Sequence, residues 1–241
     1  MPPGEWRNAG NPRAGTGIPE TGSWPRADAG SAYGAGKGSG AWVRVTERFF
    51  SRLHGELSPA ERAWPVPAGL RPAGVLVPLR MAGGEAAVVL ARRTEQVPHH
   101  KGQICFPGGS RDPGDRDLLA TALRESEEEL GIRRKDVELL GAMEPVPTVT
   151  GFFIQPFLAR IAEEAVFRLD PFEIAEDFEA PLSAFTDLSR YRAAETTFLG
   201  KPYLVYFLDY GPHTIWGATA RILHNLAEIA LRLPPYRVAA L

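Results

Sequence analysis

The sequence has little of three features that would each indicate a class of protein. It has one cysteine, Cys105, in 241 residues, which excludes an intramolecular disulfide framework and favours a reducing compartment. Its 27 basic and 29 acidic residues leave a net charge of −2, so the whole-chain charge does not indicate a polyanion-binding protein. No apolar run approaches the roughly 20 residues that a membrane-spanning helix needs. What remains is the composition of an ordinary globular protein.

Glycine and proline are abundant instead, and many of them gather at the start of the chain. Residues 1–40 contain five prolines and the low-complexity run Gly34-Ala-Gly-Lys-Gly-Ser-Gly40. Such a segment buries too little apolar surface to offset the entropy lost on ordering it. We therefore expect a disordered tail over residues 1–40 and a folded domain over residues 41–241. The run is not a P-loop, because Lys37 is followed by glycine instead of Ser or Thr.

Hydrophobic periodicity predicts a mixture of helices and strands after residue 41. The strands and helices do not alternate regularly, which indicates an α+β domain or a layered α/β/α domain. A proline- and acid-rich loop is expected before Phe178. The expected helices span residues 43–57, 117–130 and 218–233, and the expected strands span residues 73–80, 85–93, 137–143, 152–161, 196–199 and 203–210.

An acidic helix that follows a glycine loop, within Phe106–Ile132, is the segment that most needs a chemical explanation. Glu125, Glu128 and Glu129 share one face of this helix, whereas Glu127 points elsewhere. Like charges on one face repel each other, and the helix dipole disfavours anions near the C-terminal end. A bound cation resolves this conflict, and carboxylate oxygens without Cys or His favour Mg²⁺ or Mn²⁺ over zinc. The alternative is a solvated acidic face that binds nothing.

This segment resembles the box of the Nudix hydrolases, GX5EX7REUXEEXGU, in which U is a bulky aliphatic residue. Two features depart from that pattern. Ser126 replaces the aliphatic residue after Arg-Glu, and the expected first glycine and early glutamate fall on Ser110 and Arg116. The matching positions are Arg124, Glu125, Glu128, Glu129, Gly131 and Ile132.

The second departure fits the coenzyme A pyrophosphatase branch of this superfamily, whose box is similar to GGxxDPxDxDxxxTALREAxEEIGL. The branch also has an upstream signature similar to LLTxRSxxxRxHxGxxxFPGG. In this chain Pro98 stands where the signature has its second arginine, so the substrate preference stays open at that position. The positions that match the box or the signature without a gap are Arg93, Thr94, His100, Gly102, 106–109, Asp112, Pro113, Asp115, Asp117 and 121–125.

The resemblance implies a Nudix fold, an α/β/α sandwich with a mixed β-sheet and a central loop-helix-loop. It implies metal-dependent hydrolysis of coenzyme A or acyl-CoA to 3′,5′-ADP and 4′-phosphopantetheine or its acyl form, with Mg²⁺ or Mn²⁺ as cofactor. The partner is then a small-molecule substrate, with no nucleic acid and no membrane; homodimers are common in the superfamily, and the cytoplasm is the default location. The alternatives are a Nudix pyrophosphatase for another substrate, such as ADP-ribose, and a sensor that binds without turnover.

The resemblance also implies roles for individual residues around the metal. The expected ligands are Glu125, Glu128 and Glu129, and Glu125 or a loop carboxylate is expected to help deprotonate water. A further acid from a later loop often joins such sites, and Glu173 and Glu176 are the candidates, with plain solvated acids as the alternative. Arg124 completes the expected catalytic set with Glu125 and Glu128.

Basic residues and glycines before the helix are expected to contact the substrate. Arg93, His100 and Lys101 have the charge to bind phosphate, and their alternative is surface charge. Gly108 and Gly109 form the loop on which the ligand is expected to lie.

Three expectations concern residues next to these. Arg124 is expected to pair with a carboxylate across the loop, because its neighbour Glu125 faces elsewhere. Asp112 and Asp115 are expected to serve as turn or cap residues instead of metal ligands. Cys105 is expected to be a buried small hydrophobe instead of a nucleophile.

Overall fold

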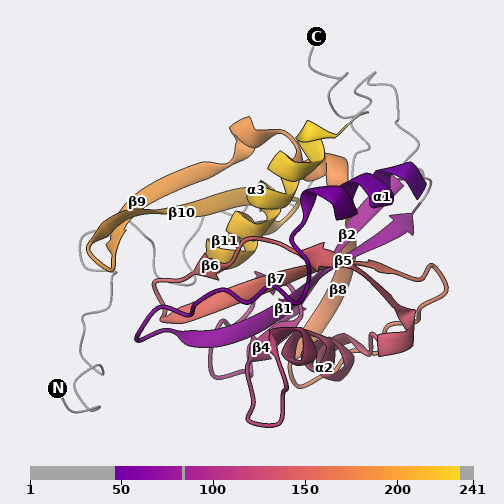
Figure 1. The fold of residues 1–241 in the computed structure, drawn as a ribbon, viewed down its shortest axis with the longest axis horizontal. Coiled ribbons are helices and arrows are strands. Elements are labelled where there is room, and N and C mark those ends of the chain that lie inside the picture. Colours follow the sequence, from indigo (N-terminus) through magenta and orange to yellow (C-terminus); the bar gives the residue numbers. More distant parts are fainter. Residues whose placement is uncertain (1–46, 83–84, 234–241) are drawn as a thin grey trace.

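The computed structural model describes residues 47–82 and 85–233. The expected tail over residues 1–40 and the start of the expected helix over 43–57 lie outside these ranges. Within them, two helices cover one face of a large β-sheet and the third covers the other face (Figure 1). The helices are α1 (Glu47–Glu56), α2 (Leu118–Leu130) and α3 (Gly217–Arg232), with short 3-10 turns η2 (Arg134–Asp136), η3 (Leu182–Phe185) and η4 (Leu188–Arg190).

The strands of the described residues form a larger and a smaller sheet. The larger sheet contains β1 (Arg71–Ala82), β2 (Glu85–Arg93), β3 (Ile104–Cys105), β4 (Gly108–Ser110), β5 (Val137–Ala142), β6 (Val146–Pro147), β7 (Phe152–Ile161) and β8 (Ile174–Pro181). The smaller sheet contains β9 (Arg192–Phe198), β10 (Lys201–Tyr210) and β11 (His213–Trp216).

The larger sheet is mixed, as expected. Its central path runs β3-β2-β1-β7-β5. Strands β1 and β7 pair in parallel, from Arg71 opposite Phe152 to Leu79 opposite Arg160, and the other pairings in this sheet are antiparallel. The parallel pair places β1 in the middle of the sheet, where both of its faces are covered.

Alternation along β1 assigns its side chains to two hydrophobic cores. Val75, Val77 and Leu79 belong to the core on the side of α1 and α3. Leu76 belongs to the core on the side of α2, which also contains Val89 of β2. Because successive side chains of a strand point to opposite faces, this pattern needs a helix layer on both sides. The expected α/β/α sandwich is confirmed.

Helix α2 begins and ends where its sequence predicts. The side chain of Asp117 caps the N-terminus by accepting a hydrogen bond from the N–H of Ala120 at 2.7 Å. Gly131 ends the helix in the left-handed conformation, with φ 69°, which glycine adopts without steric cost. The two signals fix which residues of the acidic run are helical.

Residues 162–173 contain no helix or strand, as expected of the loop before Phe178, but residues 174–177 differ. They begin β8, which pairs antiparallel with β2 and includes Glu176. Strands β4, β6 and β11, of two to four residues, were also not predicted. Elements this short show no hydrophobic period, and β8 mixes buried and exposed residues irregularly, so pairing with neighbours decides their conformation.

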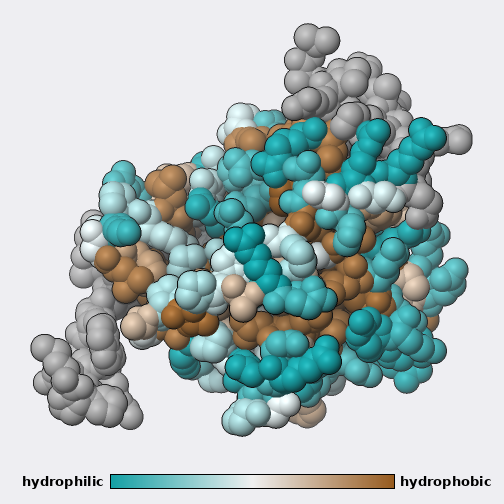
Figure 2. Space-filling view, in the orientation of Figure 1, coloured by the Kyte–Doolittle hydropathy of each residue, from teal (hydrophilic) through white to brown (hydrophobic). Residues whose placement is uncertain are grey.

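The surface of the described part is mainly hydrophilic on the face shown in Figure 2. Strongly hydrophilic residues lie over the region of α2, in the lower part of the view, and hydrophobic residues show directly above them and in smaller patches elsewhere. No helix among residues 47–82 and 85–233 is long and apolar enough to cross a membrane.

The close contact between β1 and α2 gives a test of the fold. A Cβ at Gly74 would overlap the carbonyl oxygen of Leu118 and lie 3.2 Å from the backbone N of Ala122, both in the rigid backbone of α2. We expect Gly74→Ala to lower the free energy of unfolding by about 1–3 kcal/mol, as overpacking does. Urea denaturation followed by circular dichroism measures this change.

A matched substitution in α1 is the control. A Cβ at Gly55 meets no atom within 4 Å, so Gly55→Ala should keep or raise stability, by at most about 1 kcal/mol. Equal stability of the Gly74→Ala and wild-type proteins would contradict the close packing of α2 on β1.

Candidate active site

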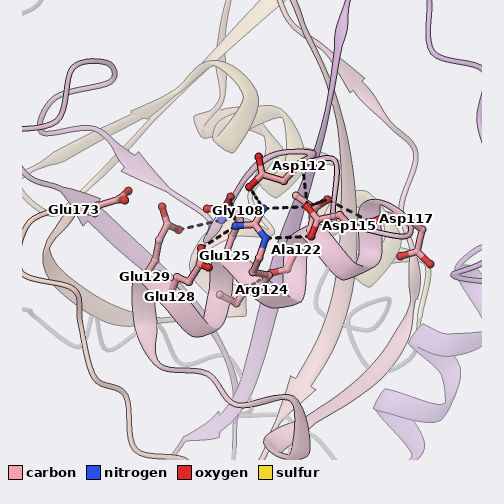
Figure 3. Close-up of polar contacts among 12 residues, drawn as sticks. Gly108, Asp112, Asp115, Asp117, Ala122, Arg124, Glu125, Glu128, Glu129 and Glu173 are labelled. Carbon is pink, nitrogen blue, oxygen red and sulfur yellow. Dashed lines mark hydrogen bonds and ion pairs between the residues drawn. The ribbon is translucent and has the colours of Figure 1, made fainter.

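The three expected carboxylates project from the C-terminal half of α2, and they differ in exposure (Figure 3). The side chain of Glu128 is 59% exposed, that of Glu125 is 20% exposed, and that of Glu129 is 3% exposed. The acids therefore run from solvent into the protein along one side of the helix. A cation approaching from solvent meets Glu128 and Glu125 before Glu129.

Glu129 is a buried carboxylate held by two donors. The Nη1 of Arg93 donates to Oε1 at 2.8 Å, and the backbone N–H of Gly108 donates to Oε2 at 3.0 Å. Burial raises the pKa of Glu129 to about 7, and the Arg93 charge and the Gly108 N–H oppose this shift. This side chain therefore changes its charge near neutral pH.

Arg93 brings Glu173 to the same group. Its Nη2 donates to Oε2 of Glu173 at 2.9 Å, so one guanidinium joins a carboxylate of α2 to one from the turn before β8. Figure 3 shows Glu173 approaching the acids of α2 from a separate segment. Both terminal nitrogens of Arg93 bind carboxylates here, and its expected contact with substrate phosphate stays a prediction.

The second candidate from the later loop lies elsewhere. Glu176 pairs with Arg92, which precedes Arg93 on β2. Neighbouring residues of a strand point to opposite faces, so Arg92 and Arg93 select different partners from the β8 segment. Of the two acids, the structure brings only Glu173 to the group on α2.

Arg124 joins the same helix to the preceding loop. Its Nε and Nη2 donate to the two oxygens of Asp115 at 3.1 and 3.0 Å, which confirms the expected partner across the loop. Its Nη1 also lies 2.8 Å from Glu128 and 2.9 Å from Glu125. The expectation that Glu125 faces away from Arg124 is therefore wrong, because the long arginine side chain reaches its neighbour's carboxylate.

Asp115 organises the loop. Besides Arg124, its Oδ2 accepts hydrogen bonds from the N–H of Asp112 at 3.0 Å and from the hydroxyl of Thr121 at 2.9 Å. Arg124, as hydrogen-bond donor, holds the pKa of Asp115 well below its usual range. This nearly buried carboxylate stays ionised and ties the loop to α2, which agrees with a turn residue and not with a metal ligand.

The two loop glycines make room for the acids. Gly109 lies opposite Gly74 in the pairing of β4 with β1, and a Cβ on Gly109 would overlap the carboxylate of Glu125. Gly108 has φ 153° and donates its N–H to Glu129. A Cβ at Gly108 would overlap the backbone of β1. The structure thus shows contacts of both glycines with protein carboxylates, and their expected contact with ligand stays a prediction.

His100 and Lys101 are exposed on the turn between β2 and β3. His100 adopts φ 58°, and its Nδ1 is 3.0 Å from Oε1 of Gln103. Within the described residues, neither side chain makes a hydrogen bond or ion pair with the acidic group. Their expected phosphate contact stays a prediction.

Cys105 lies close enough to Arg93 and Glu129 for their charges to affect it. Burial raises the pKa of its thiol to about 12. The thiol is therefore protonated at neutral pH, and a protonated thiol is a poor nucleophile. This agrees with a packing role, although the side chain is half-buried and not fully buried.

A cavity of about 420 Å³ opens beside the acidic group and was not predicted. Arg93 and Glu173 line one part of it. The remaining lining residues are Gln96, Val97, Pro98 and Phe172. Of these four residues, only Pro98 was singled out from the sequence. The position of Phe172 directly before the candidate ligand Glu173 is the signal that could have indicated this aromatic residue.

The chemistry of the acidic group fits a divalent cation. Its donors are carboxylate oxygens, which hard cations such as Mg²⁺ and Mn²⁺ prefer. Burial raises the pKa of Glu125, and repulsion from Glu128 and Glu173 adds to that rise, so a cation would relieve the conflict. Arg93 and Arg124 neutralise these acids in the structure, and no three acidic, His or Cys side chains in the described residues already surround one point.

Comparisons with known proteins identify the family. The model of the NUDIX domain matches residues 70–191. The chain is 38% identical over 158 residues to the "Uncharacterized Nudix hydrolase NudL" of Photorhabdus laumondii, covering 66% of this chain and 84% of that protein. The protein of that name from Pectobacterium atrosepticum is 37% identical over 179 residues, covering 74% and 91%.

Among solved structures, the Nudix hydrolase RenU of M. smegmatis aligns with a TM-score of 0.47 at 21% identity, covering 73% of this chain and 95% of that one. The NUDIX match spans about half of this chain and includes β1, the glycine loop, α2 and Glu173. The protein therefore belongs to the Nudix family and is a hydrolase of the pyrophosphohydrolase type.

Proposed function

We propose that this protein hydrolyses the diphosphate bond of coenzyme A or acyl-CoA, giving 3′,5′-ADP and 4′-phosphopantetheine or its acyl form. The observation that carries the hydrolytic part is that two arginines join the acids of α2 to one another and to a separate segment. Arg124 contacts Glu125 and Glu128. Arg93 contacts Glu129 and also Glu173, which comes from the turn before β8. The choice of coenzyme A is supported by the upstream signature around Arg93 and by the ungapped box.

The proposed cofactor is Mg²⁺ or Mn²⁺, which supplies positive charge to the diphosphate and lowers the pKa of a water molecule. Glu125, Glu128 and Glu129 would hold the cation, with Glu173 as the further acid. Glu125 lies near the solvent end of the group, and its raised pKa makes it a better proton acceptor than an ordinary surface carboxylate. Arg124 keeps Glu125 and Glu128 in place from the loop side.

A second candidate is cleavage of another nucleoside diphosphate derivative, such as ADP-ribose. It is favoured by Pro98, which lines the cavity beside Arg93 at the position where the branch signature has an arginine. The acidic group would act in the same way on this substrate, because both substrates contain a diphosphate. A sensor without turnover is less favoured, since binding alone gives no reason to keep three acids on one helix face.

Product analysis separates these functions. Mass spectrometry of incubations with coenzyme A, ADP-ribose and diadenosine polyphosphates, with Mg²⁺, with Mn²⁺ and with chelator, should show metal-dependent 4′-phosphopantetheine from coenzyme A. Faster cleavage of ADP-ribose would keep the metal site and overturn the proposed substrate. Ligand binding without product from any substrate would indicate the sensor.

The role of Glu125 is tested by neutralising it. Glu125→Gln should lower kcat by about 10²–10⁴, the usual contribution of a general base. The control is Glu127→Gln, which removes the same charge from an exposed position on the other side of α2 and should keep wild-type kcat. A Glu125→Gln variant with more than about a tenth of wild-type kcat would rule out the proposed role.

The pKa values of the acids predict how metal binding depends on pH. Glu129 has a pKa of about 7 and that of Glu125 is raised, so protons must leave before a cation binds. Affinity for Mg²⁺ or Mn²⁺ should therefore rise between pH 6 and pH 8. At a pH below the pKa of a ligand carboxylate, each proton that the cation displaces changes the affinity by up to about tenfold per pH unit. Isothermal titration calorimetry of the metal alone measures this, and equal affinity at both pH values would contradict the assignment of these ligands.

A further inference from the structure

The cavity beside the acidic group is lined by charged and apolar residues. Arg93 and Glu173 are the charged ones, and Arg93 joins Glu173 to Glu129. Val97, Pro98 and Phe172 are the apolar ones, and Gln96 also lines the cavity. A substrate whose diphosphate lies at the acids can therefore place an adjoining group against apolar side chains.

Thr94 joins the two chain segments that line this cavity, residues 93–98 and residues 172–173. Its hydroxyl donates to the carbonyl of Phe172 at 2.7 Å, and its backbone N–H donates to the carbonyl of Glu173 at 2.8 Å. The same hydroxyl accepts from the N–H of Gln96 at 3.3 Å. The N–H of Phe172 also donates to Oδ1 of Asp170 at 2.9 Å. The backbone under Phe172 is thus fixed before any ligand arrives.

The side chain of Phe172 does not use this fixed position for packing. It is 74% exposed, whereas Val97, from the other chain segment that lines the cavity, is 6% exposed and anchored in the protein. A single exposed apolar residue is common and by itself needs no explanation. Here the exposed ring lines an open pocket of about 420 Å³ next to the acids, and hydrogen bonds hold its backbone N–H and carbonyl.

We propose that Phe172 is the stacking platform for the nucleobase of the substrate, with Val97 and Pro98 completing the apolar side of the cavity. This assignment rests on the proposed function, because it places the nucleotide half of the diphosphate substrate in the cavity. A base is planar and offers both a ring face and a hydrogen-bonding edge, which match the Phe172 ring and the Gln96 amide. The pantetheine arm is a flexible chain with amides along it and gains little from a rigid aromatic ring.

Binding of three small probes tests the assignment apart from catalysis. AMP and ribose 5-phosphate differ only in the base, and 4′-phosphopantetheine represents the other half of coenzyme A. Stacking of one base on an aromatic ring contributes enough that Phe172→Ala should weaken AMP binding by about 5- to 150-fold. Calorimetry in the presence of Mg²⁺ should show unchanged affinity for ribose 5-phosphate and 4′-phosphopantetheine.

Two further variants complete the experiment. Phe172→Trp keeps an aromatic face and should keep the affinity for AMP. Val166→Ala shortens a similarly exposed apolar side chain, 68% exposed, outside the cavity lining and should change nothing. In turnover, Phe172→Ala should raise KM for coenzyme A with little change in kcat, as expected for a contact equally strong in ground and transition states.

The outcomes separate this inference from the proposed function. Unchanged AMP affinity in Phe172→Ala, or a loss confined to 4′-phosphopantetheine, would overturn the nucleobase assignment even if the enzyme cleaves coenzyme A. In another outcome, the wild-type protein cleaves no coenzyme A while Phe172→Ala selectively loses affinity for AMP. That pair of results would support the base site and overturn the proposed substrate. Because Phe172 is mostly exposed, we expect its variants to fold, and thermal unfolding checks this.

Discussion

The ion pair between Arg93 and Glu129 is the interaction on which the rest of the site depends. A buried carboxylate is costly unless charges and hydrogen bonds compensate it, and removing one partner of such a pair usually costs several kcal/mol. Glu129 obtains this compensation from Arg93, at the end of β2, and from the N–H of Gly108 in β4. The pair therefore requires β2, β4 and α2 to meet at one point. Gly74 and Gly109 allow this approach, because a side chain on either would overlap the backbone or an acid of α2.

The same compensation gives the site its chemical character. Arg93 and Arg124 contact four acids from two segments. The charge of Arg93 offsets only part of the effect of burial on Glu129, so the pKa of Glu129 is raised to about 7. A fully compensated group would be an inert salt-bridge network, and an uncompensated group would be protonated or unfolded. The partial balance leaves carboxylates that a divalent cation can stabilise further, which connects the packing of α2 to its proposed chemistry.

Much of this arrangement could be predicted from the sequence because local rules determine it. Asp117 and Gly131 mark the ends of α2, helical spacing brings Glu125, Glu128 and Glu129 to one side, and the expected carboxylate partner of Arg124 is Asp115. The apolar runs over residues 73–80 and 85–93 predicted two strands, and β1 and β2 form there. These features depend on residues that are close in the sequence, so local sequence patterns are enough to predict them.

The remaining features depend on strand register, which no local pattern contains. Arg92 and Arg93 are identical in type and adjacent, and the pairing of β2 with β8, which shifts register between them, decides that Arg93 meets Glu173 while Arg92 meets Glu176. The cavity follows from the next residue, because Thr94 ties the segment of Phe172 and Glu173 to the end of β2. Arg93 thus positions the acids and Thr94 positions the proposed base platform from consecutive residues of one segment. Under the proposed function, the backbone from Arg93 to Thr94 would therefore set the spacing between the diphosphate and the base, and one segment would serve both substrate selection and catalysis.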